Sequence, residues 1–409
     1  MRPRIIPAQP PWARELFTLG VTGTNGKTTT TTWLAAALRT AGAPVIKITT
    51  LGFFVDDEEL PLEKSYDGFL EAMREGLGRG ARFAAIELTS EALAQGFARA
   101  WPCQIGIFTN LSHDHLDAHG SAEHYLASKA QLFLSLPEGG AAVLNGRDEA
   151  SSLLRGIIPP GVRVLTYGVA SRGGEEPADL EAGPVKLGWS GTRFGCVGPG
   201  GTAELSVRGI GEIYAENAMA ALLGAMAAGV DASTAREAIA RAEPPPGRFE
   251  VVADSPHVIV DFAHSPDALA RTVATARTLA SADEGGGRVL AVLGAGGNRD
   301  VGKRAPMGQA VSLADRVVLT TDNPRDEDPA AIARAIAAGL EGHPGVTLQL
   351  DRRAAIAVAL AEASPRDIVL VCGRGHEREQ LVGQERRAFS DVDVVRELLA
   401  ARRATSDQG

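Results

Sequence analysis

Short apolar runs alternate with amphipathic stretches along most of the chain. The first run, residues 17–21, leads into a glycine-rich segment, and an alanine-rich stretch over 28–41 follows and ends at Gly42 and Pro44. Short apolar runs bounded by turn residues are typical of buried parallel strands. Further strands are predicted over 83–88, 105–109, 141–145 and 162–167, with helices over 121–136 and 216–228. The glycine-rich region 171–201 suggests hairpins.

Three consecutive prolines, residues 244–246, are the clearest boundary, because they end a helix and stiffen a linker. We therefore predict two domains, 1–245 and 246–409. Strands are predicted beyond the boundary over 257–262, 288–293, 316–320, 346–350 and 367–372, and helices over 266–280, 303–313, 329–340 and 353–363. This alternation predicts a second parallel sheet. The expected fold class is α/β, a phosphate-loop domain with a mostly parallel sheet followed by a Rossmann-like domain.

Composition and charge exclude several classes. The formal charge of −9 argues against a nucleic-acid surface, which requires clustered Lys and Arg. The three cysteines are far apart and form no CxxC pair, so neither a zinc knuckle nor a disulfide framework is indicated. The N-terminus lacks the apolar region of a signal peptide, and no apolar stretch approaches the roughly 18 residues of a membrane span. We expect a cytoplasmic protein without membrane insertion.

The segment from Gly20 to Thr28 follows a predicted strand and precedes a predicted helix. In that context backbone N–H groups and the helix dipole can hold phosphates. Lys27 would reach the terminal phosphates of a nucleotide, and the Thr28 hydroxyl would bind Mg²⁺. The strict phosphate-loop spacing requires glycine at 21, where this chain has Val21. The alternative is a chance Gly-Lys-Thr at a helix N-terminus.

Ionisable residues follow two further strands. Glu87 ends one apolar run, at the edge where open parallel sheets bind ligands. After the next strand, the segment 109–117 leads into three histidines and two aspartates between 113 and 119. These groups could hold Mg²⁺, although histidine is an unusual ligand for it. The alternative is a solvated loop. Lys129 lies inside a predicted helix, where a lone lysine is usually a surface residue.

Together these segments resemble the Mur ligases of peptidoglycan assembly, and most closely their tripeptide synthetases, which add diaminopimelate or lysine to a D-glutamate carboxylate. The resemblance extends from about residue 19 to residue 399 through several independent motifs. The motifs lie at 23–29, 87–90, 109–117, 247–250, 261–267, 322–325 and 373–377.

The resemblance implies an ATP-dependent carboxylate–amine ligase that works through an acyl phosphate and uses ATP and Mg²⁺. The positions it implies for ATP are Gly23, Thr24, Asn25, Gly26, Lys27, Thr28, Thr29, Asn217, Arg248 and Asp261. Those implied for catalysis are Lys27, Glu87, His115 and Lys129, and those for metal are Thr28, Glu87, His115 and Lys129 as a carbamate. Because Arg248 and Asp261 belong to the second domain, we expect domain closure to complete the ATP site.

The resemblance also implies a site for the incoming amino acid. Its residues are Arg299, Asn323, Arg325, Gly373 and Glu377. Asp-Asn-Pro-Arg at 322–325 is the form associated with diaminopimelate. Arg325 could bind a carboxylate through two hydrogen bonds, and Glu377 could accept from an ammonium group. Alternatively, Arg325 caps a helix or pairs with Asp328.

The departures from the family concentrate on the carboxylate acceptor. Fewer than 20 residues precede the first predicted strand, so the domain that grips UDP is not expected here. The family's Thr-Thr-Pro segment reads Lys64-Ser65-Tyr66, Phe97 stands where an arginine is usual, and Tyr214 replaces an asparagine. We therefore expect a divergent acceptor, or a separate subunit that supplies the missing domain.

Two other functions stay open at this point. A folylpolyglutamate-synthetase-like ligase also lacks the UDP domain, but the motifs at 322–325 and 373–377 argue against it. The other alternative is a catalytically silent nucleotide-binding scaffold or regulatory subunit. Joint retention of four residues argues against it, namely Lys27, Glu87, His115 and Lys129.

Overall fold

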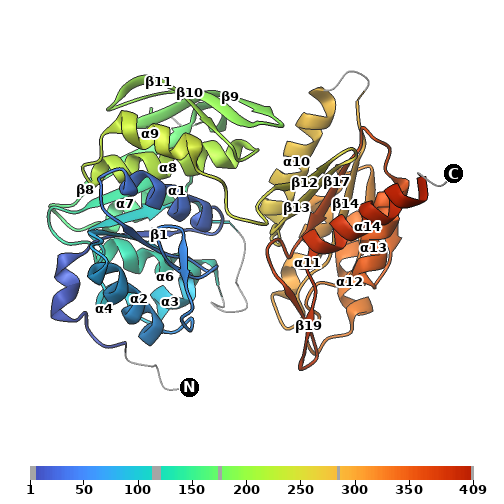
Figure 1. Cartoon of the computed structure of the whole chain (residues 1–409), viewed down its shortest axis with the longest axis horizontal. Helices are drawn as coiled ribbons and strands as arrows, with labels where there is room; N and C mark the ends of the chain where they lie inside the picture. The colour runs from blue at the N-terminus through green and yellow to red at the C-terminus, as the bar shows by residue number, and fades with distance from the viewer. Residues whose placement is uncertain (1–5, 113–120, 174–176, 283–285, 407–409) are drawn as a thin grey trace. The chain divides into compact units, whose positions relative to one another are not determined.

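The structure is a computed structural model that describes residues 6–112, 121–173, 177–282 and 286–406. The described residues as far as Pro245 form one compact unit, and those from Pro246 onward form another. Figure 1 shows the first unit in blue to green and the second in yellow to red.

The first unit is built on an eleven-stranded sheet with the order β11-β10-β9-β8-β7-β6-β1-β5-β2-β3-β4. Neighbouring strands from β9 to β2 are parallel, and antiparallel strands extend both edges. The strands are β1 (Phe17–Thr22), β2 (Val45–Ile48), β3 (Phe53–Val55), β4 (Glu58–Leu60), β5 (Phe83–Glu87), β6 (Ile105–Phe108), β7 (Ala141–Asn145), β8 (Arg163–Val169), β9 (Leu180–Gly188), β10 (Gly191–Gly198) and β11 (Gly201–Val207).

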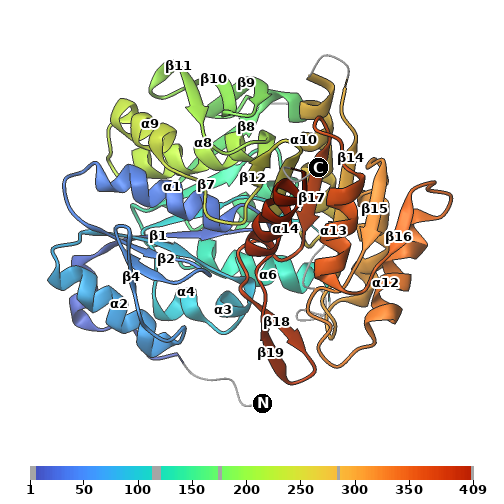
Figure 2. The same ribbon diagram turned by 45° about the vertical axis from the view of Figure 1, so that its right-hand side comes forward.

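Helices cover both faces of this sheet. The helical segments are η1 (Pro11–Glu15), α1 (Lys27–Arg39), α2 (Tyr66–Gly78), α3 (Ser90–Ala94), α4 (Phe97–Ala100), α6 (Ala122–Leu134), α7 (Ala150–Ile157), η2 (Ala170–Arg172), α8 (Glu212–Ala227) and α9 (Ala232–Arg241). Figures 1 and 2 show α1 and α8 on one face and α2 and α6 on the other. Because both faces are covered, the central strands are buried and mainly apolar rather than alternating, and the polar residues Thr18 and Thr22 of β1 are buried with them.

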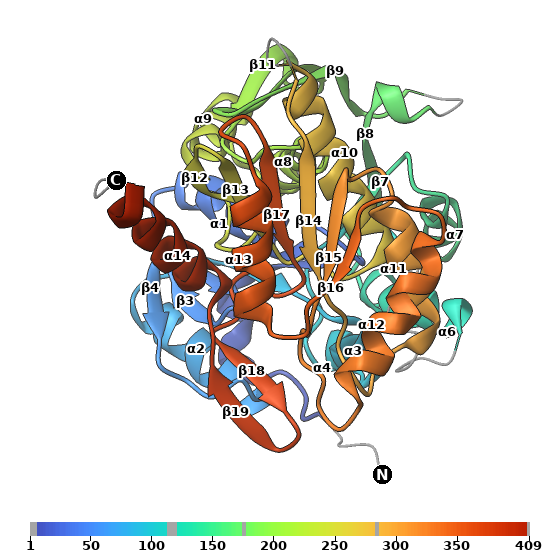
Figure 3. The ribbon, with the colours of Figure 1, turned by 90° about the vertical axis from the view of Figure 1, so that its right-hand side faces the viewer.

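The second unit has a six-stranded sheet with the order β12-β13-β17-β14-β15-β16, parallel except for β12. Its strands are β12 (Glu250–Asp254), β13 (His257–Asp261), β14 (Val289–Leu293), β15 (Arg316–Leu319), β16 (Val346–Leu348) and β17 (Ile368–Cys372), and a separate hairpin comprises β18 (Glu379–Val382) and β19 (Glu385–Ala388). Its helical segments are α10 (Pro266–Ala282), η3 (Val301–Lys303), α11 (Arg304–Ala310), α12 (Pro329–Ala337), η4 (Ala338–Leu340), α13 (Arg352–Glu362) and α14 (Asp391–Ser406). Figure 3 shows α13 and α14 in front of the sheet, where they share one apolar core with its strands.

The predicted α/β class is confirmed, since each unit contains a mostly parallel sheet with helices. The glycine-rich region does form antiparallel strands, β9 to β11. The helix expected from residue 216 begins four residues earlier, at Glu212, as α8. Among the elements that the pattern did not predict are the strand β2, the short edge strands β3 and β4, and the helices α2, α7, α9 and α14. Among the described residues, no helix is both long enough and apolar enough to cross a membrane.

One buried ion pair ties the second unit together near the ends of its strands. Arg352, at the start of α13, donates to both carboxylate oxygens of Asp391 at 2.7 Å, and both side chains are almost wholly buried. The same guanidinium donates to the carbonyl of Cys372 at 3.0 Å and to that of Thr321 at 3.3 Å. Arg352 therefore fixes the backbone at the carboxyl end of β17 and beyond β15.

Substituting Arg352→Met should lower the free energy of unfolding by about 3 to 5 kcal/mol, because Asp391 would remain a buried charge without its partner. Far-UV circular dichroism in urea measures the change. The matched control is Arg353→Met, whose exposed partner is Glu397 at 2.7 Å; its effect should stay within about 0.5 kcal/mol. Equal effects of the two substitutions would contradict the prediction.

Candidate active site

In the loop between β1 and α1, the backbone at two glycines lies too close to neighbouring side chains for a Cβ to fit. Gly26 has φ 85°, and a Cβ added there would lie 2.2 Å from Oδ1 of Asn217. Gly23 has φ 150°, and its Cβ would lie 1.9 Å from Oγ1 of Thr109. Val21, where the strict signature has glycine, lies inside β1 and is fully buried. Valine at position 21 therefore adds an apolar side chain to the core. Gly23 and Gly26, where a Cβ would clash, are both retained.

Lys27 and Thr28 begin α1 directly after this loop. The Lys27 ammonium donates to the carbonyls of Thr24 at 2.8 Å and Gly23 at 3.1 Å. The Thr28 hydroxyl donates to Oε2 of Glu87 at 3.0 Å. A helix N-terminus with a lysine fits a nucleotide phosphate, and a hydroxyl beside a carboxylate fits Mg²⁺. Within 6–112, 121–173, 177–282 and 286–406, no three His, Cys, Asp or Glu side chains gather as a metal site.

Glu87 ends β5, the parallel neighbour of β1, and its side chain is buried. Its Oε2 also accepts from the backbone N–H of Thr50 at 3.1 Å and from the Thr50 hydroxyl at 3.3 Å. Thr50 was missed by the sequence reasoning. It follows β2, which pairs with β5 in parallel, so the shared carboxyl edge of the two strands is the signal that could have found it.

The segment after β6 holds the phosphate loop from the other side. Asn110 accepts from the N–H of Asn25 at 2.9 Å and donates to its carbonyl at 3.1 Å. Thr109 donates to the same carbonyl at 2.7 Å. His115, the expected metal ligand of this segment, lies outside the described residues.

Lys129 is one of the largest fully buried side chains, with 1% of its surface exposed. Its ammonium donates to the carbonyl of Gly23 at 2.7 Å and lies 4.0 Å from the centre of the Tyr125 ring. The alternative of a surface lysine is therefore wrong. From α6, the Lys129 side chain thus reaches Gly23, the first residue of the phosphate loop after β1.

Asn217, on α8, lies behind the same loop. It is 3% exposed and accepts from the Thr30 hydroxyl at 3.3 Å. Tyr214, which replaces an asparagine of the family, is also buried and packs against Trp33 with ring centres 5.7 Å apart. The replacement at 214 therefore forms part of the core.

In the second unit, the predicted nucleotide residues Arg248 and Asp261 surround the end of β13. Asp261 accepts from the N–H groups of Phe249 at 2.6 Å and Ala263 at 2.9 Å, and from Thr272 Oγ1 at 3.1 Å. Burial raises the pKa of Asp261. The Arg248 guanidinium lies 4.3 Å from the centre of the Phe262 ring. Asp261 thus organises the backbone on both sides of this strand end.

The residues expected to bind the amino acid follow β14, β15 and β17, which are adjacent in the sheet. Gly373 has φ 113°, and a Cβ there would lie 2.6 Å from Oδ2 of Asp322. Asn323 donates to Oε2 of Glu377 at 2.9 Å. Burial and the nearby Asp322 charge raise the pKa of Glu377. The structure therefore brings Asn323, Gly373 and Glu377 together.

Arg325 has φ 50°, an uncommon conformation for a residue with a side chain. Its guanidinium donates to the carbonyl of Gly297 at 2.7 Å. A Cβ added to Gly296 would lie 3.0 Å from Nη1 of Arg325 and 3.5 Å from Cγ of Arg299, so both arginines flank this glycine. Asp328, the alternative partner of Arg325, caps α12 and pairs with Arg334 at 3.5 Å.

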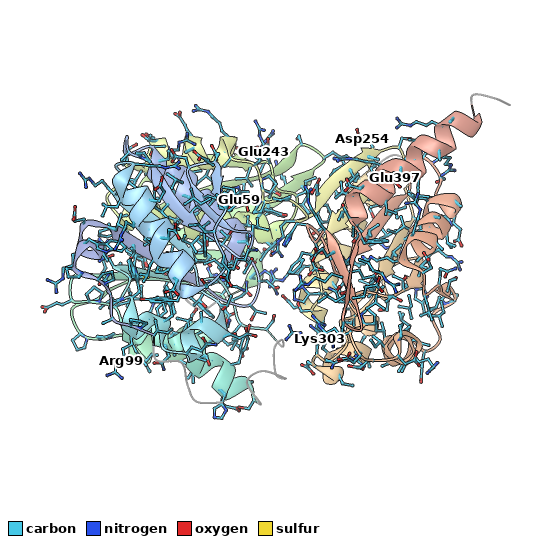
Figure 4. All side chains as sticks on the ribbon, turned by 60° about the horizontal axis from the view of Figure 1, so that its bottom comes forward. Glu59, Arg99, Glu243, Asp254, Lys303 and Glu397 are labelled. Carbon is cyan, nitrogen blue, oxygen red and sulfur yellow. The ribbon has the colours of Figure 1, made fainter. Side chains whose placement is uncertain are left out.

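Two of the departures from the family, Phe97 and Tyr66, lie in one aromatic cluster. Phe97 is 8% exposed, and its ring centre lies 5.1 Å from Phe69 and 6.4 Å from Tyr66. The Tyr66 hydroxyl donates to the carbonyl of Pro7 at 3.0 Å. Arg99, two residues after Phe97, is exposed and projects from the surface of the unit in Figure 4. The position of the missing arginine is thus filled by an apolar side chain.

Residues 21–225 match the Mur ligase middle domain, and residues 247–375 match the Mur ligase, glutamate ligase domain. The chain is 35% identical to the UDP-N-acetylmuramoyl-L-alanyl-D-glutamate–2,6-diaminopimelate ligase of Geobacillus thermodenitrificans, over 95% of this chain and 80% of that protein. It is 38% identical to the ligase of the same name from Ralstonia nicotianae, over 96% of this chain and 77% of that protein.

Solved structures of related enzymes have the same fold. A diaminopimelate ligase of the same name, at 32% identity, superposes with a TM-score of 0.65 over 95% of this chain and 79% of its own. Folylpolyglutamate synthase from Mycobacterium tuberculosis has a TM-score of 0.71 over 88% of this chain and 89% of its own, but at 21% identity this likeness shows the fold alone. With both domains matched and relatives above 30% identity, the chain belongs to the Mur ligase family of ATP-dependent amino acid ligases.

Proposed function

We propose that this protein joins diaminopimelate to a carboxylate acceptor at the expense of ATP, through an acyl phosphate. An oxygen of the acceptor carboxylate attacks the γ-phosphorus of ATP, and ADP leaves. The amine then attacks the acyl carbon, and phosphate leaves as the amide forms. The contact that carries this proposal is the one between Thr28 and Glu87, which places a hydroxyl and a carboxylate 3.0 Å apart beside the phosphate loop. Such a reaction also fits the expected cytoplasmic location.

In this proposal the residues around the loop would hold the phosphates and the metal. Lys27 would exchange its loop carbonyls for the terminal phosphates and balance their charge. Thr28, Glu87, His115 and carbamylated Lys129 would hold Mg²⁺. Bound there, Mg²⁺ would neutralise charge on the transferring phosphoryl group. Carbamylation would turn a buried cation into a carboxylate, the ligand type that Mg²⁺ prefers.

The cluster in the second unit supports an amino acid with charged groups at both ends. Arg325 and Arg299 flank Gly296 and could receive a carboxylate. Glu377 and the Asn323 amide, joined at 2.9 Å, could receive an ammonium group. Diaminopimelate carries both groups at the end remote from the reacting amine. The names of the relatives at 35% and 38% identity support the same choice.

We propose that the acceptor differs from the UDP-linked peptide named for those relatives. The support is local: Phe97 and Tyr66 lie in an aromatic cluster where the family has groups for an anionic acceptor. Lys64 is exposed, and its ammonium donates to the carbonyl of Thr50 at 2.7 Å. A smaller or less anionic carboxylate would suit these residues better.

The experiment that tests the function incubates the protein with ATP, Mg²⁺ and diaminopimelate against a panel of acceptors, with products identified by mass spectrometry. We expect an amide product and stoichiometric phosphate, with a small peptide or free carboxylate preferred over the UDP-linked dipeptide. Preference for the UDP-linked dipeptide would overturn the divergent acceptor and retain the ligase. Absence of turnover across the panel would favour the scaffold alternative.

Substituting Lys129→Ala should reduce kcat by at least about a hundredfold, since it removes a proposed metal ligand. Bicarbonate cannot repair the variant by carbamylation, but acetate could partly replace the lost carboxylate and restore activity. Steady-state phosphate release measures both effects. Lys186→Ala, an exposed position on β9, is the control and should keep full activity. Full activity in Lys129→Ala would exclude the carbamate role.

Substituting Arg325→Ala should raise the KM for diaminopimelate about tenfold to a hundredfold and leave that for ATP nearly unchanged, because a charge-assisted contact to the amino acid is lost. Initial rates at varied concentrations of each substrate separate the two constants. Arg334→Ala, an exposed arginine on α12, serves as the control. An equal rise in both constants would mean that Arg325 is structural.

A further inference from the structure

Arg374 is a fully buried arginine that the proposed mechanism does not use. It follows β17 and lies between Gly373 and Gly375, both of which have positive φ. Burying a guanidinium is costly unless its donors are well paired. Its closest carboxylate oxygen, Oε2 of Glu377, is 3.4 Å from Nη1, and its Nε is buried without a hydrogen-bond partner among the described residues. A contribution to the stability of the fold therefore does not by itself explain why an arginine is buried at this position.

The hydrogen bonds of Arg374 lead to Asn323 of the amino acid site and to the β18–β19 hairpin. Nη1 donates to Oδ1 of Asn323 at 2.9 Å, and Nη2 donates to the carbonyls of Glu379 at 2.6 Å and Phe389 at 3.4 Å. Those carbonyls flank the β18–β19 hairpin, which Figure 2 shows extending from the second unit. Arg374 thus connects the hairpin to the Asp-Asn-Pro-Arg loop.

These donors fix which way the Asn323 amide faces. Arginine has only donors, and the backbone N–H of Leu381 also donates to Oδ1 of Asn323, at 2.8 Å. A reversed amide would place its NH₂ against two donors and its oxygen against the Glu377 carboxylate. The observed orientation instead directs the NH₂ to Oε2 of Glu377 at 2.9 Å.

The same arrangement orients Glu377. The Asn323 amide and the Arg374 guanidinium both approach Oε2, and no hydrogen bond among the described residues reaches Oε1. The guanidinium charge also favours the ionised carboxylate, against the burial and the Asp322 charge that raise the pKa of Glu377. Oε1 is therefore the oxygen that can accept from a ligand.

We infer that Arg374 is a positioning residue, which holds the Asn323 amide and the Glu377 carboxylate in the orientation that receives the ammonium group of the incoming amino acid. The inference rests on the proposed function for the identity of that amino acid. Its geometric part, the control of Asn323 and Glu377, stands on the contacts of Arg374 alone.

Kinetics test the effect on the substrate. Arg374→Gln should raise the KM for diaminopimelate about tenfold or more, while the KM for ATP changes less than about twofold. Arg374→Lys keeps a cation and should recover part of the loss. Arg386→Gln, at an exposed arginine of β19 that pairs with Glu379, is the control and should match the wild type. Equal changes in both KM values, or no recovery with lysine, would overturn the inference.

A double-substitution cycle tests whether Arg374 acts through Asn323. If it does, adding Arg374→Gln to Asn323→Ala should change the KM for diaminopimelate far less than Arg374→Gln does alone. Independent, multiplicative effects would overturn the inference.

Crystal structures of the wild type and Arg374→Gln provide a readout that needs no turnover. We expect the contact between Asn323 and Oε2 of Glu377 to be lost in the variant, and its retention would overturn the inference. If the wild type does not use diaminopimelate, the proposed substrate fails while this comparison still decides the role of Arg374. If Arg374→Gln does not fold, the comparison is made with Arg374→Lys, in which one ammonium cannot serve both Asn323 and the Glu379 carbonyl. We then expect the contact between Asn323 and Oε2 of Glu377 to lengthen, and an unchanged distance would overturn the inference.

Discussion

The hydrogen bond between Thr28 and Glu87 depends on the register of two neighbouring strands. β1 and β5 run parallel with Val21 opposite Glu87, so the acid emerges at the level where β1 enters the phosphate loop. The helix that follows then presents its first hydroxyl to that acid at 3.0 Å. A shift of β5 by one residue would turn Glu87 to the other face of the sheet. The extensive apolar packing of the central strands, which sets this register, is therefore also what assembles the candidate metal site.

The sequence was sufficient to predict much of this arrangement. Apolar runs between turn residues located most of the buried parallel strands within a residue or two, because a strand covered on both faces carries mainly apolar side chains, but β2 was not predicted. The position of Glu87 at a strand end followed from the same runs, whereas Asp261 was predicted from the family resemblance. The short edge strands β3 and β4 were not predicted, since the pattern of three residues cannot be distinguished from that of a loop.

Other parts of the site depend on contacts between distant segments. Thr50 reaches Glu87 only because β2 and β5 pair, and because β2 was not among the predicted strands, the edge that the two strands share was not predicted either. The burial of Lys129 is similar: its helical neighbours fit a surface lysine, and the resemblance to a family was needed to predict otherwise. Arg374 lies inside the motif at 373–377, but nothing there indicates its role, because its partners lie 51 residues before it and on a hairpin after it.

The positive φ of Arg325 has a consequence for the thermodynamics of ligand recognition. A side-chain-bearing residue in the left-handed region costs about 1 to 3 kcal/mol, and here tertiary contacts on both sides impose it: its N–H donates to Leu381 and its carbonyl accepts from Gly383. The free-energy cost of this conformation is thus offset when the chain folds, before any ligand binds. For the amino acid site proposed above, no further loss of backbone freedom at Arg325 would be subtracted from the affinity, which is the advantage of a preorganised binding group.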